Sequence, residues 1–333
     1  MTDHTYDVLT IGNAIVDIIA RCEGDFLVEN DIIKGAMNLI DMERAEALYS
    51  AMGPAVETSG GSAGNTAAGI SSFGGKAAYI GKVADDHLGK VFRHDIEAIG
   101  VTYNTKALEQ GETTARSMIF VTPDGERSMN TYLGACVKLS ADDIVPGMVQ
   151  ESAITYFEGY LWDPENAKHA IREAARIAQA SQRKVAMTLS DSFCVDRYRD
   201  EFLELIKSGT VDIVFANDSE LKSLYQTSDL ATGISALKEH CALAAVTRGE
   251  EGSVVVTREG TQEVDAHPIE KLVDTTGAGD LYAAGFLFGL THGENLANCA
   301  RLGGLAASEV IQHIGPRPQV SLKNLAQQNG FNV

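Results

Sequence analysis

The feature that most constrains the fold is an alternation of short β-branched runs with helical segments from about residue 155 onward. This alternation is typical of a mostly parallel sheet with helices packed on its faces. The predicted strands are 154–157, 185–189, 211–215, 244–247 and 253–257. The segment after Asp163-Pro164-Glu165 predicts a helix, because Asp is a good N-cap, Pro suits the first turn and small apolar residues repeat at helical spacing from Ala167 to Ala178. The fold class is therefore α/β.

The N-terminal half joins the same α/β body, but two stretches do not follow its alternation. The other predicted elements of the body are strands at 6–11 and 77–80 and helices at about 62–73, 86–99, 277–292 and 294–312. Residues 14–45 and 101–135 instead read as strands and turns, with extended runs at 113–121 and 126–133. We predict that these two stretches form a small β lid, and that 1–13, 46–100 and 136–333 form one large body.

The charge balance restricts what the protein can bind. The chain has 46 acidic and 27 basic residues, a formal net charge of −19, which repels phosphate backbones and anionic lipid headgroups. This argues against nucleic-acid and membrane partners. An anionic ligand would need helix N-termini, a few Arg or Lys side chains and a divalent cation.

Cysteine usage and the N-terminus bear on the compartment. The five cysteines are scattered and contain no CxxC pair, so zinc and redox centres are not predicted. The N-terminus lacks the basic region and apolar run of a signal peptide. A cytoplasmic protein is expected.

The run DTTGAGD at 274–280 is the strongest chemical signal in the chain. A strand-like segment at 271–273 leads through it into a helix, so the N–H groups of Gly277, Ala278 and Gly279 would face outward at a helix N-terminus and bind an anion. Asp280 in the first helical turn could accept a hydroxyl proton. A tight strand-to-helix turn, with Asp280 as a first-turn acid, explains this run equally well.

Two other phosphate-binding motifs fail. Gly74-Gly75-Lys76-Ala77 lacks the first glycine of a P-loop, whose place is taken by Ile70, and has Ala after the Lys. No GxGxxG occurs, so a Rossmann dinucleotide enzyme loses its main support.

The DTTGAGD loop, together with Gly60-Gly61-Ser62-Ala63-Gly64-Asn65, resembles the two glycine motifs of the ribokinase/PfkB family, and the resemblance covers nearly the whole chain. It implies a ribokinase-like three-layer α/β/α body that binds nucleotide and carries catalysis, with the lid over the substrate site. It also implies ATP and Mg²⁺ as cofactors, small-molecule substrates, and a monomer or homodimer. Asp280 would be the catalytic base, and the amides of Gly277, Ala278 and Gly279 the anion hole.

The resemblance also assigns residues to the acceptor. Asp17 and Asn65 would bind sugar hydroxyls, and Gly61 would let the ring approach the backbone, with Asn13 and Ser62 beside them. A carboxylate and an amide suit adjacent diol oxygens. For each residue alone, a helix cap or turn is the commoner explanation.

The nucleotide side is assigned in the same way. Asn217 and Glu220 resemble the N-x-x-E motif that places Mg²⁺ through water, although a capping box has the same spacing. Thr247, Gly249 and Gly252 resemble a nucleotide-contacting segment, and otherwise form a hairpin turn.

Three further residues are assigned to phosphate and cation binding. Arg127 would be a lid arginine that approaches the phosphates, with a solvated hairpin arginine as the alternative. Asp274 and Thr276, with carbonyls near Ile311 and Gly315, resemble a monovalent-cation site that K⁺ could occupy.

Among members of the family, the chain looks closest to adenosine kinases. The resemblance lies in GNAIVDI at 12–18, the GGSxxN core and LSDSF at 189–193. The expected walls of a nucleobase slot are Ile15, Leu133, Tyr160 and Phe193. The expected reaction is ATP-dependent phosphorylation of the adenosine 5′-hydroxyl to give AMP and ADP in purine salvage.

Other functions remain open. A ribokinase-like or fructokinase-like sugar kinase would use the same machinery on a free sugar. A ligand sensor without catalysis would be expected to have lost the anion loop or its Asp, and a nicotinamide dehydrogenase is the most distant option.

Overall fold

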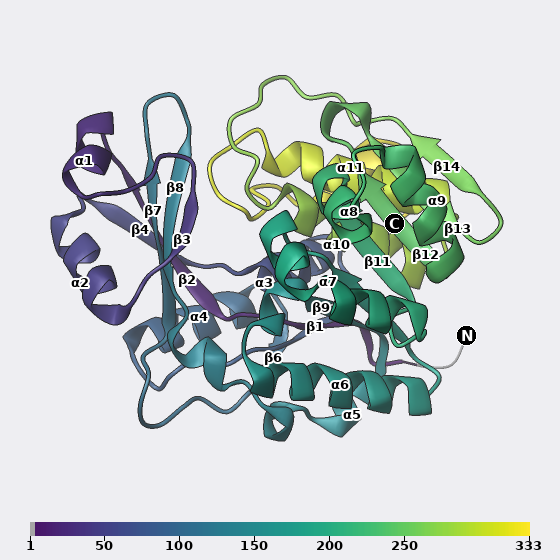
Figure 1. Cartoon of the computed structure of the whole chain (residues 1–333), viewed down its shortest axis with the longest axis horizontal. Helices are drawn as coiled ribbons and strands as arrows, with labels where there is room; N and C mark the ends of the chain where they lie inside the picture. The colour runs from purple at the N-terminus through teal and green to yellow at the C-terminus, as the bar shows by residue number, and fades with distance from the viewer. Residues whose placement is uncertain (1–3) are drawn as a thin grey trace.

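The structure is a computed structural model that describes residues 4–333, and its centre is a nine-stranded sheet in the order β14-β13-β12-β11-β10-β9-β1-β5-β6 (Figure 1). Neighbouring strands from β12 to β6 run parallel, whereas β13 and β14 are antiparallel additions at one edge. The strands are β1 (Tyr6–Ile11), β5 (Ala77–Ile80), β6 (Thr102–Tyr103), β9 (Ser152–Glu158), β10 (Lys184–Thr188), β11 (Ile213–Asn217), β12 (Leu243–Thr247), β13 (Ser253–Thr257) and β14 (Thr261–Val264). The predicted α/β class is confirmed.

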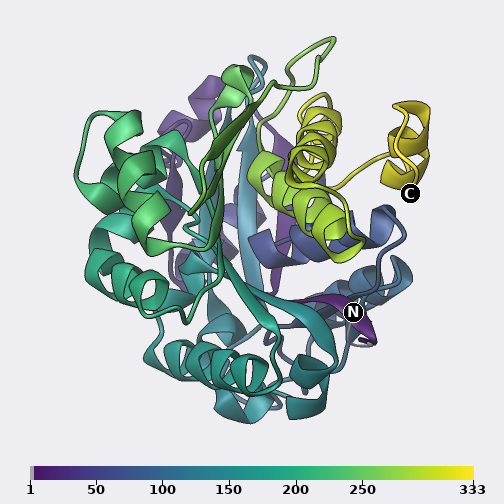
Figure 2. The ribbon, with the colours of Figure 1, turned by 90° about the vertical axis from the view of Figure 1, so that its right-hand side faces the viewer.

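Helices cover both faces of this sheet, as Figure 2 shows. Successive side chains of a strand point to opposite faces, so Leu9 and Ile11 of β1 pack in one core and Val8 in the other. The first face is covered by α5 (Pro146–Gln150), α6 (Glu165–Ala180), α7 (Ser192–Lys207), α8 (Asp218–Tyr225) and α9 (Leu230–His240). The second is covered by α3 (Ser62–Ser72), α4 (His87–Ala98), α10 (Ala278–Thr291) and α11 (Leu296–Val310), with α12 (Leu322–Gln328) packed outside α10 and α11.

The start of α6 differs from its prediction. The predicted apolar stripe is buried as expected, but the N-cap is Pro164 rather than Asp163. The Asp163 carboxylate instead accepts a hydrogen bond from the Tyr198 hydroxyl (2.6 Å) and pairs with Arg197 (3.2 Å), both on α7. Contacts with a neighbouring helix therefore replace the cap.

A smaller five-stranded sheet, in the order β3-β8-β7-β2-β4, stands beside the body with α1 (Gly24–Glu29) and α2 (Met42–Ala51) at its outer side (Figure 1). Its strands are β2 (Ile15–Arg21), β3 (Met37–Leu39), β4 (Ala55–Ser59), β7 (Ala115–Val121) and β8 (Arg127–Tyr132). Two sheet memberships differ from the predicted boundaries. β4 pairs with β2 although 46–100 was assigned to the body, and β6 lies in the large sheet although 101–135 was assigned to the lid.

The lead-in to the DTTGAGD loop also differs, because 271–273 is not a strand. The N–H groups of Val273 and Asp274 both donate to the Ile311 carbonyl, at 2.8 and 3.2 Å, so this segment is held by the end of α11 and not by a sheet. The remaining short elements are 3₁₀ helices, η1 (Gly134–Lys138), η2 (Ala141–Asp143), η3 (Gly159–Trp162) and η4 (Gly249–Glu251). None of the helices within residues 4–333 has the length and apolar character that crossing a membrane would need.

Candidate active site

The two glycine motifs, more than 200 residues apart in sequence, meet at the N-termini of α3 and α10. The Asp280 carboxylate accepts hydrogen bonds from the Ser62 hydroxyl (2.6 Å) and from the Asn65 side-chain amide (2.9 Å). The Thr66 hydroxyl donates to the Asp280 carbonyl (3.2 Å). The predicted base and the predicted substrate loop therefore form one polar cluster.

Glycine is required where this loop presses on neighbouring chain segments. Gly61 has φ +82°, and a Cβ there would lie 2.1 Å from the carbonyl oxygen of Asn13. A Cβ on Gly60 would lie 2.3 Å from a carboxylate oxygen of Asp17. Asn13 and Asp17, which were both predicted to bind the phosphoryl acceptor, therefore lie against the backbone of this loop.

We expect Gly61→Ala to destabilise the fold by about 1–3 kcal/mol, because alanine at this φ is strained and its Cβ overlaps a backbone oxygen. Urea unfolding would measure the loss, and kinetics of the folded fraction would show a raised KM for the acceptor. Gly53→Ala is the control, since no described residue other than its chain neighbours comes within 4 Å of a Cβ there. Equal stability of the two variants would contradict the prediction.

Burial raises the pKa of the carboxyls at this site. Desolvation raises the pKa of Asp17 to about 7, against the opposing charges of Arg317 and Arg127. Desolvation also raises the pKa of Asp280, while its hydrogen bonds from Ser62 and Asn65 and the charge of Arg317 oppose the rise. A carboxylate with a raised pKa is a stronger proton acceptor, which is the property that a general base needs.

Glu158, at the end of β9, ties the first strand to α3. Its carboxylate accepts from the backbone N–H (2.9 Å) and side-chain amide (2.7 Å) of Asn13 and from the Ala63 N–H (2.8 Å). Burial raises the pKa of Glu158 to about 7. The Asn13 amide, predicted to lie beside the sugar, is therefore engaged with Glu158 in this structure.

The loop predicted to bind an anion, residues 274–280, is called the anion loop below. Gly277 has φ +80° and packs against Pro316, where a Cβ would lie 2.8 Å away. The Ala278 N–H donates to the Thr275 carbonyl (3.2 Å), so this amide is engaged inside the loop. Within residues 4–333, the N–H groups of Gly277 and Gly279 have no acceptor, which leaves two of the three predicted amides for an anion.

A buried ion pair links this loop to the small sheet. Arg127 of β8 lies with one Nη 2.5 Å from an Asp274 carboxylate oxygen, and the two side chains are 5% and 4% exposed. The contact is poorly aligned for a hydrogen bond, and no guanidinium nitrogen of Arg127 has a hydrogen-bond partner in the described part of the chain. Asp274 also accepts from the N–H groups of Thr276 (3.0 Å) and Gly315 (3.1 Å). The solvated arginine considered as the alternative is therefore wrong.

The predicted nucleotide residues lie at the ends of adjacent parallel strands, because Asn217 of β11 is in register with Thr247 of β12. Asn217 and Glu220 form a complete capping box, and burial raises the pKa of Glu220 to about 7. Gly252 has φ +80°, and a Cβ on it would meet the Val264 carbonyl oxygen at 2.1 Å, whereas Gly249 is open. In the described residues, no group of three or more His, Cys, Asp or Glu side chains could hold a metal ion.

The predicted nucleobase walls differ in how firmly they are held. Ile15, Leu133 and Tyr160 are half-buried. The Tyr160 hydroxyl donates to the Ser190 carbonyl (3.4 Å), and its N–H to the Ser190 hydroxyl (3.2 Å). Phe193 is 75% exposed, so its ring has the least support from packing.

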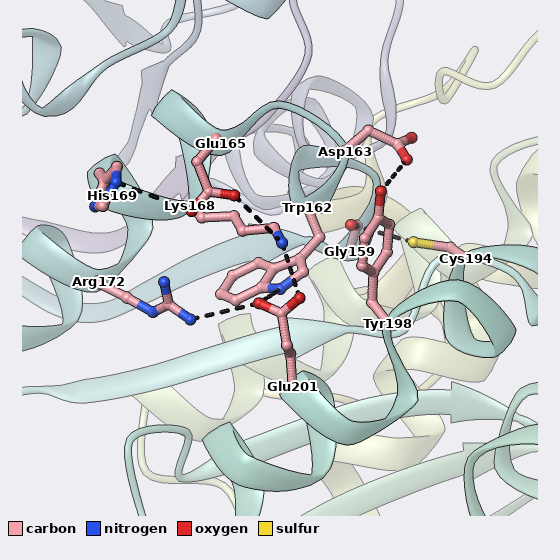
Figure 3. Close-up of polar contacts among 10 residues, drawn as sticks. All are labelled: Gly159, Trp162, Asp163, Glu165, Lys168, His169, Arg172, Cys194, Tyr198 and Glu201. Carbon is pink, nitrogen blue, oxygen red and sulfur yellow. Dashed lines mark hydrogen bonds and ion pairs between the residues drawn. The ribbon is translucent and has the colours of Figure 1, made fainter.

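The segment that carries Tyr160 is anchored between α6 and α7 (Figure 3). The Trp162 indole N–H donates to Glu201 (2.9 Å), which also pairs with Lys168 (2.8 Å). The Lys168 ammonium lies over the Tyr198 ring, 4.9 Å from its centroid. Sequence reasoning missed this cluster, because its members follow no motif.

Arg317 is a further site residue that sequence reasoning missed, as is Glu158. Arg317 follows Gly315-Pro316 after α11, and its Nε donates to the side-chain oxygen Oδ1 of Asn65 (3.1 Å). Its only signal in the sequence is a basic residue just after a glycine-proline turn in an acidic chain.

With this geometry established, comparison with known proteins decides the family. Residues 8–322 match the family described as pfkB family carbohydrate kinase. The chain belongs to the PfkB family. As a PfkB kinase it is a phosphotransferase with an alcohol group as acceptor, and the family implies ATP and Mg²⁺.

Its relatives include both nucleoside and sugar kinases by name. The structure of this PfkB kinase is similar to the adenosine kinase from Sinorhizobium meliloti, with 66% identity, a TM-score of 0.92 and coverage of 98% of this chain and 99% of that one. A probable sugar kinase from Rhizobium etli CFN 42 has 59% identity, a TM-score of 0.93 and the same coverage. The adenosine kinase of Saccharomyces cerevisiae is 26% identical over 337 residues, 94% of this chain and 96% of that protein.

Proposed function

We propose that this PfkB kinase transfers the γ-phosphate of ATP to the 5′-hydroxyl of adenosine, giving AMP and ADP for purine salvage. The observation that carries the proposal is the pair of hydrogen bonds joining Asp280 to Ser62 and Asn65. They bring the carboxylate beside the loop that holds the acceptor and next to the free amides of the anion loop. Similarity to the Sinorhizobium meliloti adenosine kinase supports a nucleoside acceptor.

Asp280 accepts the proton of the 5′-hydroxyl as the hydroxyl oxygen attacks the γ-phosphorus. The ADP oxygen leaves on the opposite side, and the amides of Gly277 and Gly279 stabilise charge on the transferring group. Asp17, Gly61 and Asn65 hold the ribose, so that the hydroxyl is presented to Asp280. The base rests against Tyr160, with Ile15, Leu133 and Phe193 as the other walls.

The Mg²⁺ that accompanies ATP supplies charge neutralisation at the phosphate oxygens. Both carboxylate oxygens of Glu220 accept hydrogen bonds from Asn217, at 2.6 and 3.0 Å. Both oxygens are therefore already engaged in the capping box. The pair therefore suits a metal held through water, as the motif implied.

The small sheet acts as the lid over the acceptor and brings Arg127 to the phosphates. The three guanidinium nitrogens have no hydrogen-bond partner among residues 4–333, which supports this, since buried donors of that kind require an acceptor. When Arg127 leaves Asp274, that carboxylate and Thr276 become available to a K⁺ ion behind the anion loop. In the present structure Arg127 supplies the positive charge at Asp274.

A panel of acceptors tests the proposal. ATP consumption would be measured with adenosine, inosine, cytidine, ribose and fructose, and we expect saturable turnover with adenosine at the highest kcat/KM. 5′-Deoxyadenosine is the matched control, because it keeps the base and the diol but lacks the attacking hydroxyl, and it should inhibit without being phosphorylated. Saturable turnover with a free sugar alone would reject adenosine in favour of the sugar-kinase alternative.

A further inference from the structure

A chain of hydrogen bonds runs from Arg317 through Asn65 to Asp280. The Arg317 Nε donates to the side-chain oxygen Oδ1 of Asn65 (3.1 Å), and the side-chain N–H of the same amide donates to the Asp280 carboxylate (2.9 Å). An amide has its acceptor and its donors at opposite ends. A guanidinium, which can only donate, therefore determines which end of the Asn65 amide faces Asp280.

We propose that Arg317 is a positioning residue of this site, which fixes the Asn65 amide so that its N–H group holds the Asp280 carboxylate toward the acceptor. The orientation follows from the bonds themselves. Only the step from orientation to reaction rate rests on the proposed function, in which Asp280 is the base.

The surrounding chain holds Arg317 in place from two sides. Gly315 donates to Asp274 (3.1 Å), and Pro316 packs against Gly277. On the α3 side, the guanidinium lies next to Gly64, since a Cβ there would be in van der Waals contact with an Arg317 Nη, at 3.5 Å. Residues 315–317 therefore both support the anion loop and place the Arg317 guanidinium next to Asn65.

The guanidinium also supplies positive charge to an acidic cluster. Burial lowers the pKa of Arg317, and the charges of Asp17, Asp95 and Asp280 oppose this. In return, Arg317 opposes the rise in pKa that burial causes at Asp17 and Asp280. One Nη of Arg317 has no hydrogen-bond partner within residues 4–333.

Other groups around Asp280 shape its titration. The charged and titratable groups that interact with it are Arg317 after α11, Asp17 of β2, Tyr156 and Glu158 of β9, Tyr160 of η3 and Glu220 of α8. Arg317 is the one cation among them. Removing Arg317 should therefore raise the pKa of Asp280. As the pH falls, the Asp280 carboxylate would then become protonated at a higher pH than in the wild type.

The test compares Arg317→Met and Arg317→Lys with the wild type. For Arg317→Met, we expect kcat to fall about tenfold to a hundredfold and the acid limb of the pH–rate profile to move up by about one pH unit. Arg317→Lys keeps the charge but has no donor at the Nε position. Its acid limb should stay near that of the wild type while kcat remains reduced.

A second readout needs no acceptor. The side-chain ¹³C carboxyl resonance of Asp280, assigned by its absence in Asp280→Asn, would be titrated in the wild type and in both Arg317 variants. We expect a higher midpoint in Arg317→Met and altered Asn65 side-chain amide resonances in both variants. If the wild type phosphorylated no nucleoside, the proposed function would fail, and this titration would still decide the inference.

Arg93→Met is the matched control. Arg93 is a partly buried arginine whose guanidinium donates to the Tyr103 and Thr105 carbonyls, away from Asp280. It should change stability without moving the acid limb. Arg317→Met could instead lower only the thermal stability and leave the Asp280 titration midpoint and the Asn65 side-chain resonances at their wild-type values. Arg317 would then be a packing residue, and the inference would be wrong.

Discussion

Asp280→Asn is expected to lower kcat about a thousandfold, within the range that general base catalysis supplies. Asparagine keeps the size of the side chain and can still accept the hydrogen bond from Ser62, but it cannot take a proton from the acceptor hydroxyl. KM should change little, because the acceptor is held by other residues. Steady-state kinetics with ATP and adenosine, alongside the unfolding midpoint, would measure both effects.

The matched control for this change is Asp229→Asn. Asp229 is the N-cap of α9, its side chain accepts from the Thr232 N–H, and asparagine caps helices about as well as aspartate. This variant should keep wild-type kinetics. A folded Asp280→Asn protein with near-normal turnover would remove Asp280 as the base, and the helix-start explanation of the DTTGAGD run would then stand.

The second large effect concerns stability. Asp274→Asn should lower the free energy of unfolding by about 3–5 kcal/mol, because it removes the carboxylate that is ion-paired with the buried Arg127 guanidinium. Urea denaturation followed by circular dichroism would measure the change. The double variant Arg127→Met/Asp274→Asn should recover most of the loss, since no unpaired charge is left behind.

An exposed ion pair provides the comparison. Glu173 and Arg176 pair at 2.8 Å on the surface of α6, where solvent screens the interaction. Glu173→Gln should leave the unfolding curve unchanged. If Asp274→Asn behaved in the same way, Arg127 would already be solvated in solution, and the contact between the small sheet and the anion loop would not be a stable one.

The fold was predictable where the pattern of side chains reports burial directly. The β-branched runs of the large sheet are buried on both faces, and they were found within one or two residues of their ends. β4 was missed because it is an outer strand with exposed Ala55 and Val56, so it lacks an apolar pattern. β6 was assigned to the lid because two residues carry no periodicity, although Tyr103 is buried against Phe92 and Tyr79.

Some residues of the candidate site could likewise be predicted from the sequence, and others could not. The residues within glycine motifs could be named from the sequence, because a turn that needs glycine constrains its neighbours as well. The pairing of those residues with distant side chains could not, even where both members of a pair had been named. Arg127 and Asp274 are 147 residues apart, and Arg317 and Asn65 are 252 apart. Nothing local distinguishes such charged side chains from solvated ones until the fold brings them together.

The arrangement of the two sheets has a consequence for how such an enzyme can evolve. The groups proposed to handle phosphate lie mostly on the large sheet and its helices, whereas Ile15, Asp17 and Leu133 lie on or next to the small one. On the proposed assignment of residues, substitutions in the small sheet would therefore change which hydroxyl compound is accepted while the phosphate-handling groups stay as they are. Arg127 is the exception, since it belongs to the small sheet but contacts the anion loop. It is the position at which a change of acceptor preference would also disturb catalysis.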